Sequence, residues 1–104
     1  MDQTRAVLDL LPEDVRTSAR IDSNGEVSWR LEDVPRALAA LSDARLVVLG
    51  LDTRSYEEDG GIIEIPFADF SSSPMTPEQA RDEALSVLSD YAGELGDWIL
   101  ITWR

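Results

Sequence analysis

The two most apolar runs of the chain stand on either side of an acidic turn, and together they predict a β-hairpin. Residues 46–51 are aliphatic apart from one glycine, residues 56–61 are acidic and end in two glycines, and residues 62–67 are again mostly aliphatic. Such runs around a glycine-containing polar connection are typical of paired strands. Because the first run does not alternate with polar residues until Asp52, we expect a strand over residues 45–53 inside a sheet rather than at its edge.

The second strand of this hairpin, residues 61–67, is expected at a sheet edge because Pro66 has no N–H to donate to a neighbouring strand. A third strand is predicted over residues 97–103, which are almost continuously apolar. Trp98 and Trp103 differ in parity along that strand, so their side chains point to opposite faces of the sheet. One of the two tryptophans is therefore expected on the face away from the helices.

The first third of the chain carries weaker patterns. Apolar residues at helical spacing predict a short amphipathic helix over residues 3–11, which Pro12 ends. Further on, Asn24-Gly25 is a dipeptide that accepts the positive φ of a tight turn. A short extra hairpin near residues 19–29 is therefore possible.

Two longer helices are predicted from their apolar stripes and their starts. One runs over residues 33–43, with Asp33 as its N-cap. The other runs over residues 76–92 and begins with a capping box formed by Thr76 and Gln79. Gly93, with a second glycine soon after it, should end this helix.

Together these elements predict an α+β fold in a single domain, residues 1–104. Its expected centre is a small three-stranded mixed sheet with helices packed on one face. The last helix should carry the chain across the sheet by a right-handed crossover, which places the third strand beside the first. Numbered along the chain, the strands then have the spatial order 2-1-3, with the central strand antiparallel to both neighbours.

Composition removes much of the usual chemistry. A chain of 104 residues that is 43% hydrophobic is expected to fold, but it has no cysteine and no histidine. Disulfides and cysteine metal sites are thereby excluded, and the commonest general base and metal ligand is missing. We therefore expect no enzymatic activity, no cofactor and no metal site. No run is long enough to span a bilayer and no signal peptide is evident, so a cytoplasmic location is expected.

Charge is unevenly distributed along the chain. The net charge is −12, and every basic residue is an arginine. Residues 1–49 have nine acids and six arginines, a net charge of −3, whereas residues 50–104 have twelve acids and three arginines, a net charge of −9. Such a field repels nucleic acid and anionic membranes and attracts a basic protein. The simpler alternative is that acidity only keeps a small domain in solution.

Acidic side chains of the hairpin and its exit, with one tyrosine, form the predicted partner-binding site. Its members are Asp52, Tyr56, Glu57, Glu58, Asp59, Glu64 and Asp69. Paired carboxylates can also serve acid–base catalysis, but their spacing here specifies no cleft. The turn lacks the alternating oxygen ligands and closing glutamate of a calcium-binding EF-hand loop. We therefore interpret these residues as a surface for a basic protein, with the tyrosine as a desolvated anchor.

The order of motifs resembles a known family. Val27-Ser28-Trp29 precede an amphipathic helix, and Val48-Leu49-Gly50-Leu51-Asp52 lead into the acidic turn. This arrangement resembles the immunity protein 40 family of bacterial polymorphic toxin systems, in which a tryptophan precedes a helix and an aliphatic strand ends in Gly-Gly-Asp before a variable turn. The resemblance covers about residues 26–103, and this chain departs from the pattern at Leu51, where a second glycine is expected.

The resemblance implies a non-catalytic protein that binds and neutralises a cognate bacterial toxin domain, for example a basic nuclease. It assigns no toxin-contacting residues. An alternative is an adaptor or homo-oligomerisation module that buries a sheet face or the edge of the second strand against another chain. A third hypothesis is an enzyme that uses carboxylates or a metal ion. Under the first hypothesis we expect a monomer or a weak dimer.

Overall fold

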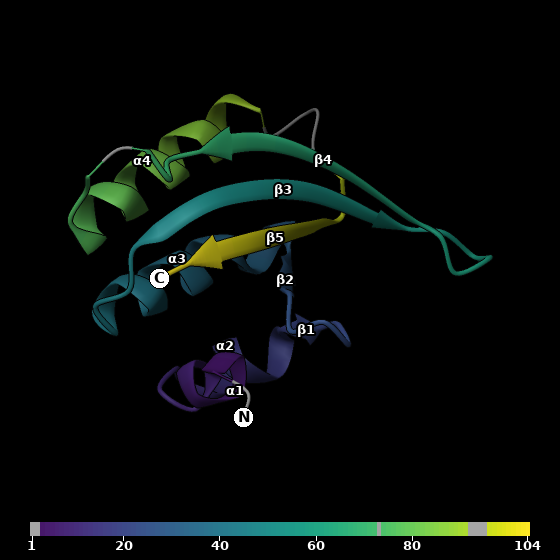
Figure 1. The fold of residues 1–104 in the computed structure, drawn as a ribbon, viewed down its shortest axis with the longest axis horizontal. Coiled ribbons are helices and arrows are strands. Elements are labelled where there is room, and N and C mark those ends of the chain that lie inside the picture. Colours follow the sequence, from purple (N-terminus) through teal and green to yellow (C-terminus); the bar gives the residue numbers. More distant parts are fainter. Residues whose placement is uncertain (1–2, 73, 92–95) are drawn as a thin grey trace.

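The computed structural model describes residues 3–72, 74–91 and 96–104 and has an α+β architecture (Figure 1). Its strands are β1 (Arg20–Ile21), β2 (Val27–Arg30), β3 (Val48–Tyr56), β4 (Ile62–Asp69) and β5 (Trp98–Trp103). Its helices are α1 (Gln3–Leu8), α2 (Glu13–Ser18), α3 (Val34–Asp43) and α4 (Pro77–Asp90), with a 3₁₀ turn η1 (Leu31–Asp33) before α3.

The predicted three-stranded mixed sheet is wrong. In the described residues the sheet has five strands in the order β1-β2-β5-β3-β4, and all neighbouring strands are antiparallel. The hairpin near residues 19–29 does form, and its second strand pairs with the outer side of β5, where Ser28 lies opposite Leu100. This pairing lets the sheet bury Val27 and Trp29, which a three-stranded sheet would leave outside. Among the three strands that were predicted, β3 does lie between β4 and β5, antiparallel to both, and β4 is an edge strand as expected.

β3 begins three residues later than predicted because the preceding helix uses those residues to end. Arg45 has φ 66°, and the N–H of Leu46 donates to the carbonyl of Leu41 at 3.0 Å. A residue with left-handed backbone, followed by a hydrogen bond from the next N–H back to a carbonyl of the last helical turn, is a common helix C-terminal motif. β3 then continues to Tyr56, which pairs with Ile62 of β4. The apolar run therefore includes a helix end as well as a strand.

The two predicted helix starts have different outcomes. The capping box is confirmed: Thr76 Oγ1 accepts the N–H of Gln79 at 3.1 Å, and the Gln79 side chain accepts the N–H of Thr76 at 3.0 Å. Asp33 does occupy the N-cap position of α3, but its side chain makes no capping hydrogen bond and pairs with Arg36. α4 ends at Asp90, and the predicted stop at position 93 lies outside the described residues.

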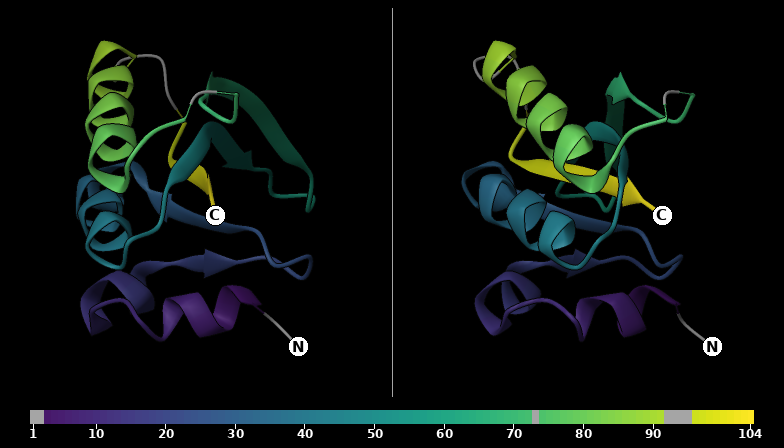
Figure 2. Two further views of the ribbon diagram at one scale, coloured as in Figure 1. Left: turned by 60° about the vertical axis from the view of Figure 1, so that its left-hand side comes forward. Right: turned by 90° about the vertical axis from the view of Figure 1, so that its left-hand side faces the viewer.

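Helices α3 and α4 lie side by side against one face of the sheet, as Figure 2 shows, so the prediction that helices cover one face is confirmed for this pair. Trp29 is fully buried between sheet and helices, and its Nε1 donates to the carbonyl of Val15 in α2 at 2.9 Å. The opposite face of the sheet is called the open face below. Trp98 lies on the open face and Trp103 on the helix side, where its ring is 6.3 Å from that of Trp29.

Candidate functional site

The turn that joins β3 to β4 is closed by its own backbone and by one of its acids. The N–H of Glu57 donates to the carbonyl of Gly61 at 2.8 Å, and Asp59 Oδ1 accepts the N–H of Gly61 at 2.9 Å. Gly60 has φ 91°, a conformation that glycine adopts at little cost because it has no Cβ. Glu57 and Glu58 are exposed. The turn, called the acidic tip below (residues 57–61), therefore presents carboxylates to solvent while Asp59 helps to shape it.

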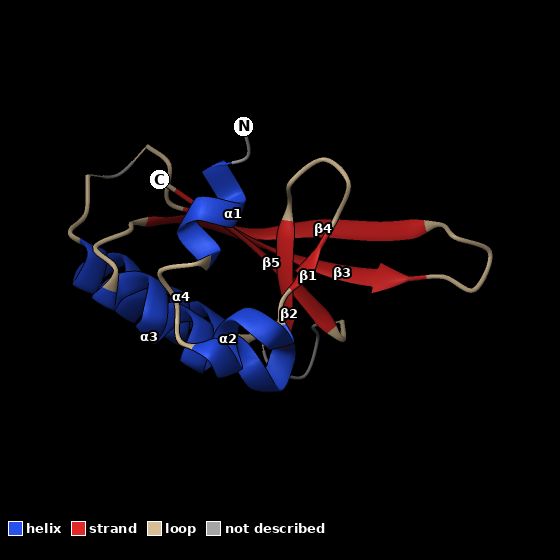
Figure 3. Ribbon diagram, turned by 90° about the horizontal axis from the view of Figure 1, so that it is seen from below, coloured by secondary structure: helices blue, strands red, loops and turns tan. Residues whose placement is uncertain are grey.

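The edge strand β4 exposes apolar side chains next to the acidic tip. Ile62, Ile63 and Ile65 are 52%, 52% and 57% exposed. Figures 1 and 3 show that the ends of β3 and β4 that meet at the turn extend beyond the helices, in keeping with this exposure. Full burial of an isoleucine side chain stabilises by roughly 1.5–3 kcal/mol. Burying the exposed halves of these three isoleucines against another molecule would therefore contribute about 3 kcal/mol of binding free energy.

On the open face, one arginine holds three carboxylates from two hairpins. Arg54 of β3 is only 3% exposed. Its Nε donates to Glu64 of β4 at 2.8 Å, its Nη2 pairs with Glu26 at 3.1 Å, and its Nη1 pairs with Asp22. The turn between β1 and β2 is thereby tied across the sheet to the β3–β4 hairpin. We call these four residues, with Asp52, the arginine–carboxylate cluster.

Crowding in this cluster changes the acidity of its members. Burial raises the pKa of Asp52 to about 6, and a hydrogen bond to Glu64 and the charge of that residue add to the rise, while the charge of Arg54 opposes it. For Arg54, burial lowers the pKa, but hydrogen bonds to Tyr56, Glu64 and Glu26 raise it by more. Asp52 can therefore exchange a proton near pH 6, whereas the arginine stays charged at every accessible pH.

Tyr56 lies against the open face rather than free at the tip. Its hydroxyl is 3.2 Å from Ser28 Oγ, and its ring meets that of Trp98 edge-on at a centroid distance of 6.0 Å. The guanidinium of Arg20 lies 3.6 Å from the Tyr56 ring centroid, and that of Arg30 lies 4.8 Å from the Trp98 ring centroid. Cation–π contacts of this kind cover both rings. The tyrosine is half-buried and engaged within the protein.

Asp69 is placed apart from the tip. It pairs with Gly50 at the opposite end of β4, and its Oδ1 accepts hydrogen bonds from the Ser71 backbone at 2.9 Å and the Ser71 hydroxyl at 2.6 Å. These two bonds lower the pKa of Asp69. The carboxylate therefore stabilises the chain where it leaves the sheet.

The seven predicted site residues thus fall into three groups. Glu57, Glu58 and Asp59 share the acidic tip; Asp52, Tyr56 and Glu64 share the open face; Asp69 stands alone at the other end of β4.

Sequence reasoning missed Arg54, Asp22 and Glu26. A signal for the arginine was present, because it shares a strand face with Asp52 and Tyr56 at alternate positions and is the lone base of residues 48–69. No signal identified the two acids, since their approach to the arginine depends on the pairing of β2 with β5.

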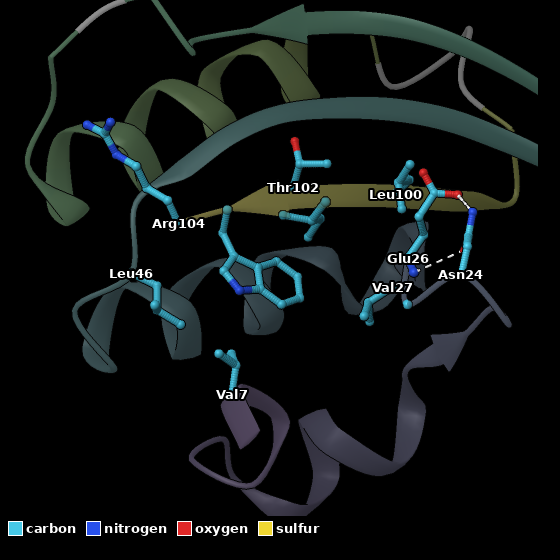
Figure 4. A pocket seen from close by; sticks show the side chains of 11 residues that line it. Val7, Asn24, Glu26, Val27, Leu46, Leu100, Thr102 and Arg104 are labelled. Atoms are coloured by element: carbon cyan, nitrogen blue, oxygen red, sulfur yellow. Dashed lines mark hydrogen bonds between the residues drawn. The ribbon is translucent and has the colours of Figure 1, made fainter. Parts of the chain in front are cut away.

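A cavity of about 320 Å³ lies between α1 and the end of β5 and shares Glu26 with the arginine–carboxylate cluster (Figure 4). Val7 and Trp103 contribute apolar walls, and Asn24 and Glu26 lie on its polar side. Glu26 accepts a hydrogen bond from Asn24 Nδ2 at 2.7 Å, and that bond and its contact with Arg54 lower the pKa of Glu26. A carboxylate held ionised in this way is a poor proton acceptor at neutral pH.

Within the described ranges, no three or more acids are arranged to hold a metal ion. No described helix has both the length and the apolar character to cross a membrane. Comparison with known proteins adds no relationship: no protein family, curated protein or solved structure matches this chain.

Proposed function

We propose that this chain is a non-catalytic immunity protein that binds and neutralises a cognate bacterial toxin domain in the cytoplasm through its β3–β4 hairpin. The observation that carries the proposal is the exposure of Ile62, Ile63 and Ile65 directly beside the acidic tip on a projecting hairpin. Apolar groups surrounded by charge are typical of interfaces, where burial supplies affinity and charge selects the partner.

The charge of the chain supports a basic partner. The net charge is −12, and Glu57, Glu58 and Asp59 concentrate negative charge at the end of the hairpin. A basic toxin domain, such as a nuclease whose active site attracts phosphates, would be steered toward this end. Carboxylates of the tip would then occupy positions that phosphates occupy in the toxin's substrate.

The proposal predicts that a toxin domain is encoded beside the gene, and it is tested by producing the chain together with that domain. We expect the chain to restore growth and to bind the purified toxin domain with an association rate that falls steeply as salt is added. Replacing Glu57 and Glu58 with glutamine should slow association. The matched control replaces Glu83 and Asp90 of α4, two exposed acids outside the hairpin, with their amides.

Growth that is not restored, together with no measurable binding, would refute the proposal. Equal slowing by the two double variants would show that net charge alone, and not the tip, attracts the partner.

The exposed edge of β4 also favours a second candidate, an adaptor or homo-oligomerisation module. An edge strand with exposed isoleucines can pair with the same strand of another copy. Sedimentation separates the two candidates, because a stable homodimer that forms without any partner supports assembly. We rank this candidate lower because two copies, each with a net charge of −12, repel one another.

A further inference from the structure

The backbone of β4 has one side that meets β3 and one side that meets no strand in the described part of the chain. At the turn, Glu57 N–H donates to the carbonyl of Gly61. Residue pairs in an antiparallel ladder alternate between those that exchange backbone hydrogen bonds and those that do not. Glu57 and Gly61 form a hydrogen-bonded pair, so every second pair along the register does the same. Ile63 and Ile65 therefore exchange backbone hydrogen bonds with β3.

The residues between them turn their backbone groups outward. Ile62 and Glu64 therefore each present an N–H and a C=O to the open edge, and Pro66 presents a C=O only. Proline falls at an outward position, where its missing N–H costs the hairpin no internal hydrogen bond. The edge can thus accept an added strand along residues 62–66, and Pro66 limits how far that strand can extend.

We propose that an extended segment of the toxin domain adds to this edge as a further antiparallel or parallel strand, which deepens the proposed function and rests on it. Main-chain hydrogen bonds to Ile62 and Glu64 would hold the segment, and its side chains would set specificity at alternate positions. On the helix side of the sheet, the segment would place apolar residues beside Ile63 and Ile65, which are both more than half exposed.

Charge decides between a toxin segment and a second copy of this chain. If β4 paired antiparallel with itself, the acidic tip of each copy would lie near Asp69 of the other, and like charges would meet at both ends. A segment with lysine or arginine beside the tip meets no such repulsion. The occupant we infer is therefore an extended segment with alternating apolar residues and a basic end, provided by the toxin domain.

Amide hydrogen exchange followed by NMR tests this proposal directly. In the free protein, the amides of Ile62 and Glu64 should exchange fast and those of Ile63 and Ile65 slowly. On addition of the inactivated toxin domain encoded beside the gene, exchange at Ile62 and Glu64 should slow at least tenfold. If the toxin binds but these two amides keep their free exchange rates, strand addition is wrong while the proposed function stands. If the toxin does not bind, both fail.

A pair of variants gives an independent readout. Ile62→Pro removes the outward N–H and the side chain, whereas Ile62→Ala removes most of the side chain and keeps the N–H. We expect the proline variant to bind the toxin domain at least tenfold more weakly than the alanine variant, with circular dichroism confirming that both are folded. Equal affinities of the two folded variants would overturn strand addition. Sedimentation of the free protein as a stable dimer would also overturn it, by assigning the edge to a second copy.

Discussion

Loss of Arg54 should destabilise this fold strongly, and Arg54→Met measures what the arginine–carboxylate cluster contributes. The methionine keeps an apolar stem of similar length but removes the charge that Asp22, Glu26 and Glu64 share. Removing one partner of a buried ion pair typically costs about 3–5 kcal/mol, because the remaining charges are left uncompensated. The arginine is 3% exposed, but its three partners are 19–38% exposed and keep part of their hydration.

We therefore expect the low end of that range, about 3 kcal/mol at pH 7.5. A domain of this size has a total stability of about 5–15 kcal/mol, so the loss is a large share. Urea unfolding followed by tryptophan fluorescence would show it as a decrease in midpoint of about 1–3 M, given the usual dependence of stability on denaturant. Arg81→Met is the matched control, because Arg81 pairs with the exposed Asp82 and should contribute little.

The loss should depend on pH. Without the arginine, no positive charge offsets the mutual repulsion of the cluster carboxylates, so the folded variant takes up protons more readily than the folded wild type as the pH falls. The difference in stability between wild type and variant should therefore shrink as the pH falls from 7.5 to 5. A variant as stable as the control, or a difference that does not change with pH, would refute this account of the cluster.

Three further changes test particular contacts. Asp52→Asn should stabilise the protein by about 1–2 kcal/mol at pH 7.5, after allowance for solvent screening, because a folded-state pKa raised to about 6 makes the ionised aspartate unfavourable in the folded protein. Urea unfolding should show this gain in stability decreasing as the pH falls through 6 toward 4. A variant less stable than wild type at pH 7.5 would contradict the prediction. Thr76→Ala removes the capping box of α4 and should cost about 1 kcal/mol in unfolding free energy, whereas Ser89→Ala at an exposed position of the same helix should not destabilise. Gly60→Ala should lower the free energy of unfolding by about 1 kcal/mol because φ at this position is 91°, and Gly60→Asn should lower it less because asparagine tolerates left-handed backbone. Equal decreases in stability of the two variants, measured by thermal unfolding, would argue against backbone strain as the cause.

Local patterns predicted those parts of the fold that depend on neighbouring residues. The capping box at Thr76, the edge position of β4 and the order of β4, β3 and β5 all follow from turn chemistry, proline geometry and apolar runs. The addition of β1 and β2 to the sheet did not follow, because β2 is only four residues long and its partner lies some seventy residues away. The start of β3 was misplaced because apolar residues that end a helix look the same as those that begin a strand.

In the candidate site, too, features set by neighbouring residues could be predicted, and features set by strand pairing could not. The acids of the tip could be named because they are contiguous in the sequence. Tyr56 was expected as a desolvated anchor for a partner; its ring lies under Arg20, and that contact depends on where β1 lies in the sheet. Arg54 was overlooked because its burial requires carboxylates from two hairpins that only the folded sheet brings together.

Affinity for the proposed toxin partner, measured by titration calorimetry on two variants, tests most directly the proposal that the β3–β4 hairpin is the binding surface. Ile63→Ser with Ile65→Ser removes exposed apolar surface from β4, and Leu10→Ser removes a side chain that is 68% exposed outside the hairpin. Loss of about 2–3 kcal/mol of burial predicts roughly 100-fold weaker binding for the β4 variant. The Leu10 variant should bind as wild type does. Unchanged affinity of the β4 variant, or equal weakening by both, would contradict the assignment of the hairpin as the partner-binding surface.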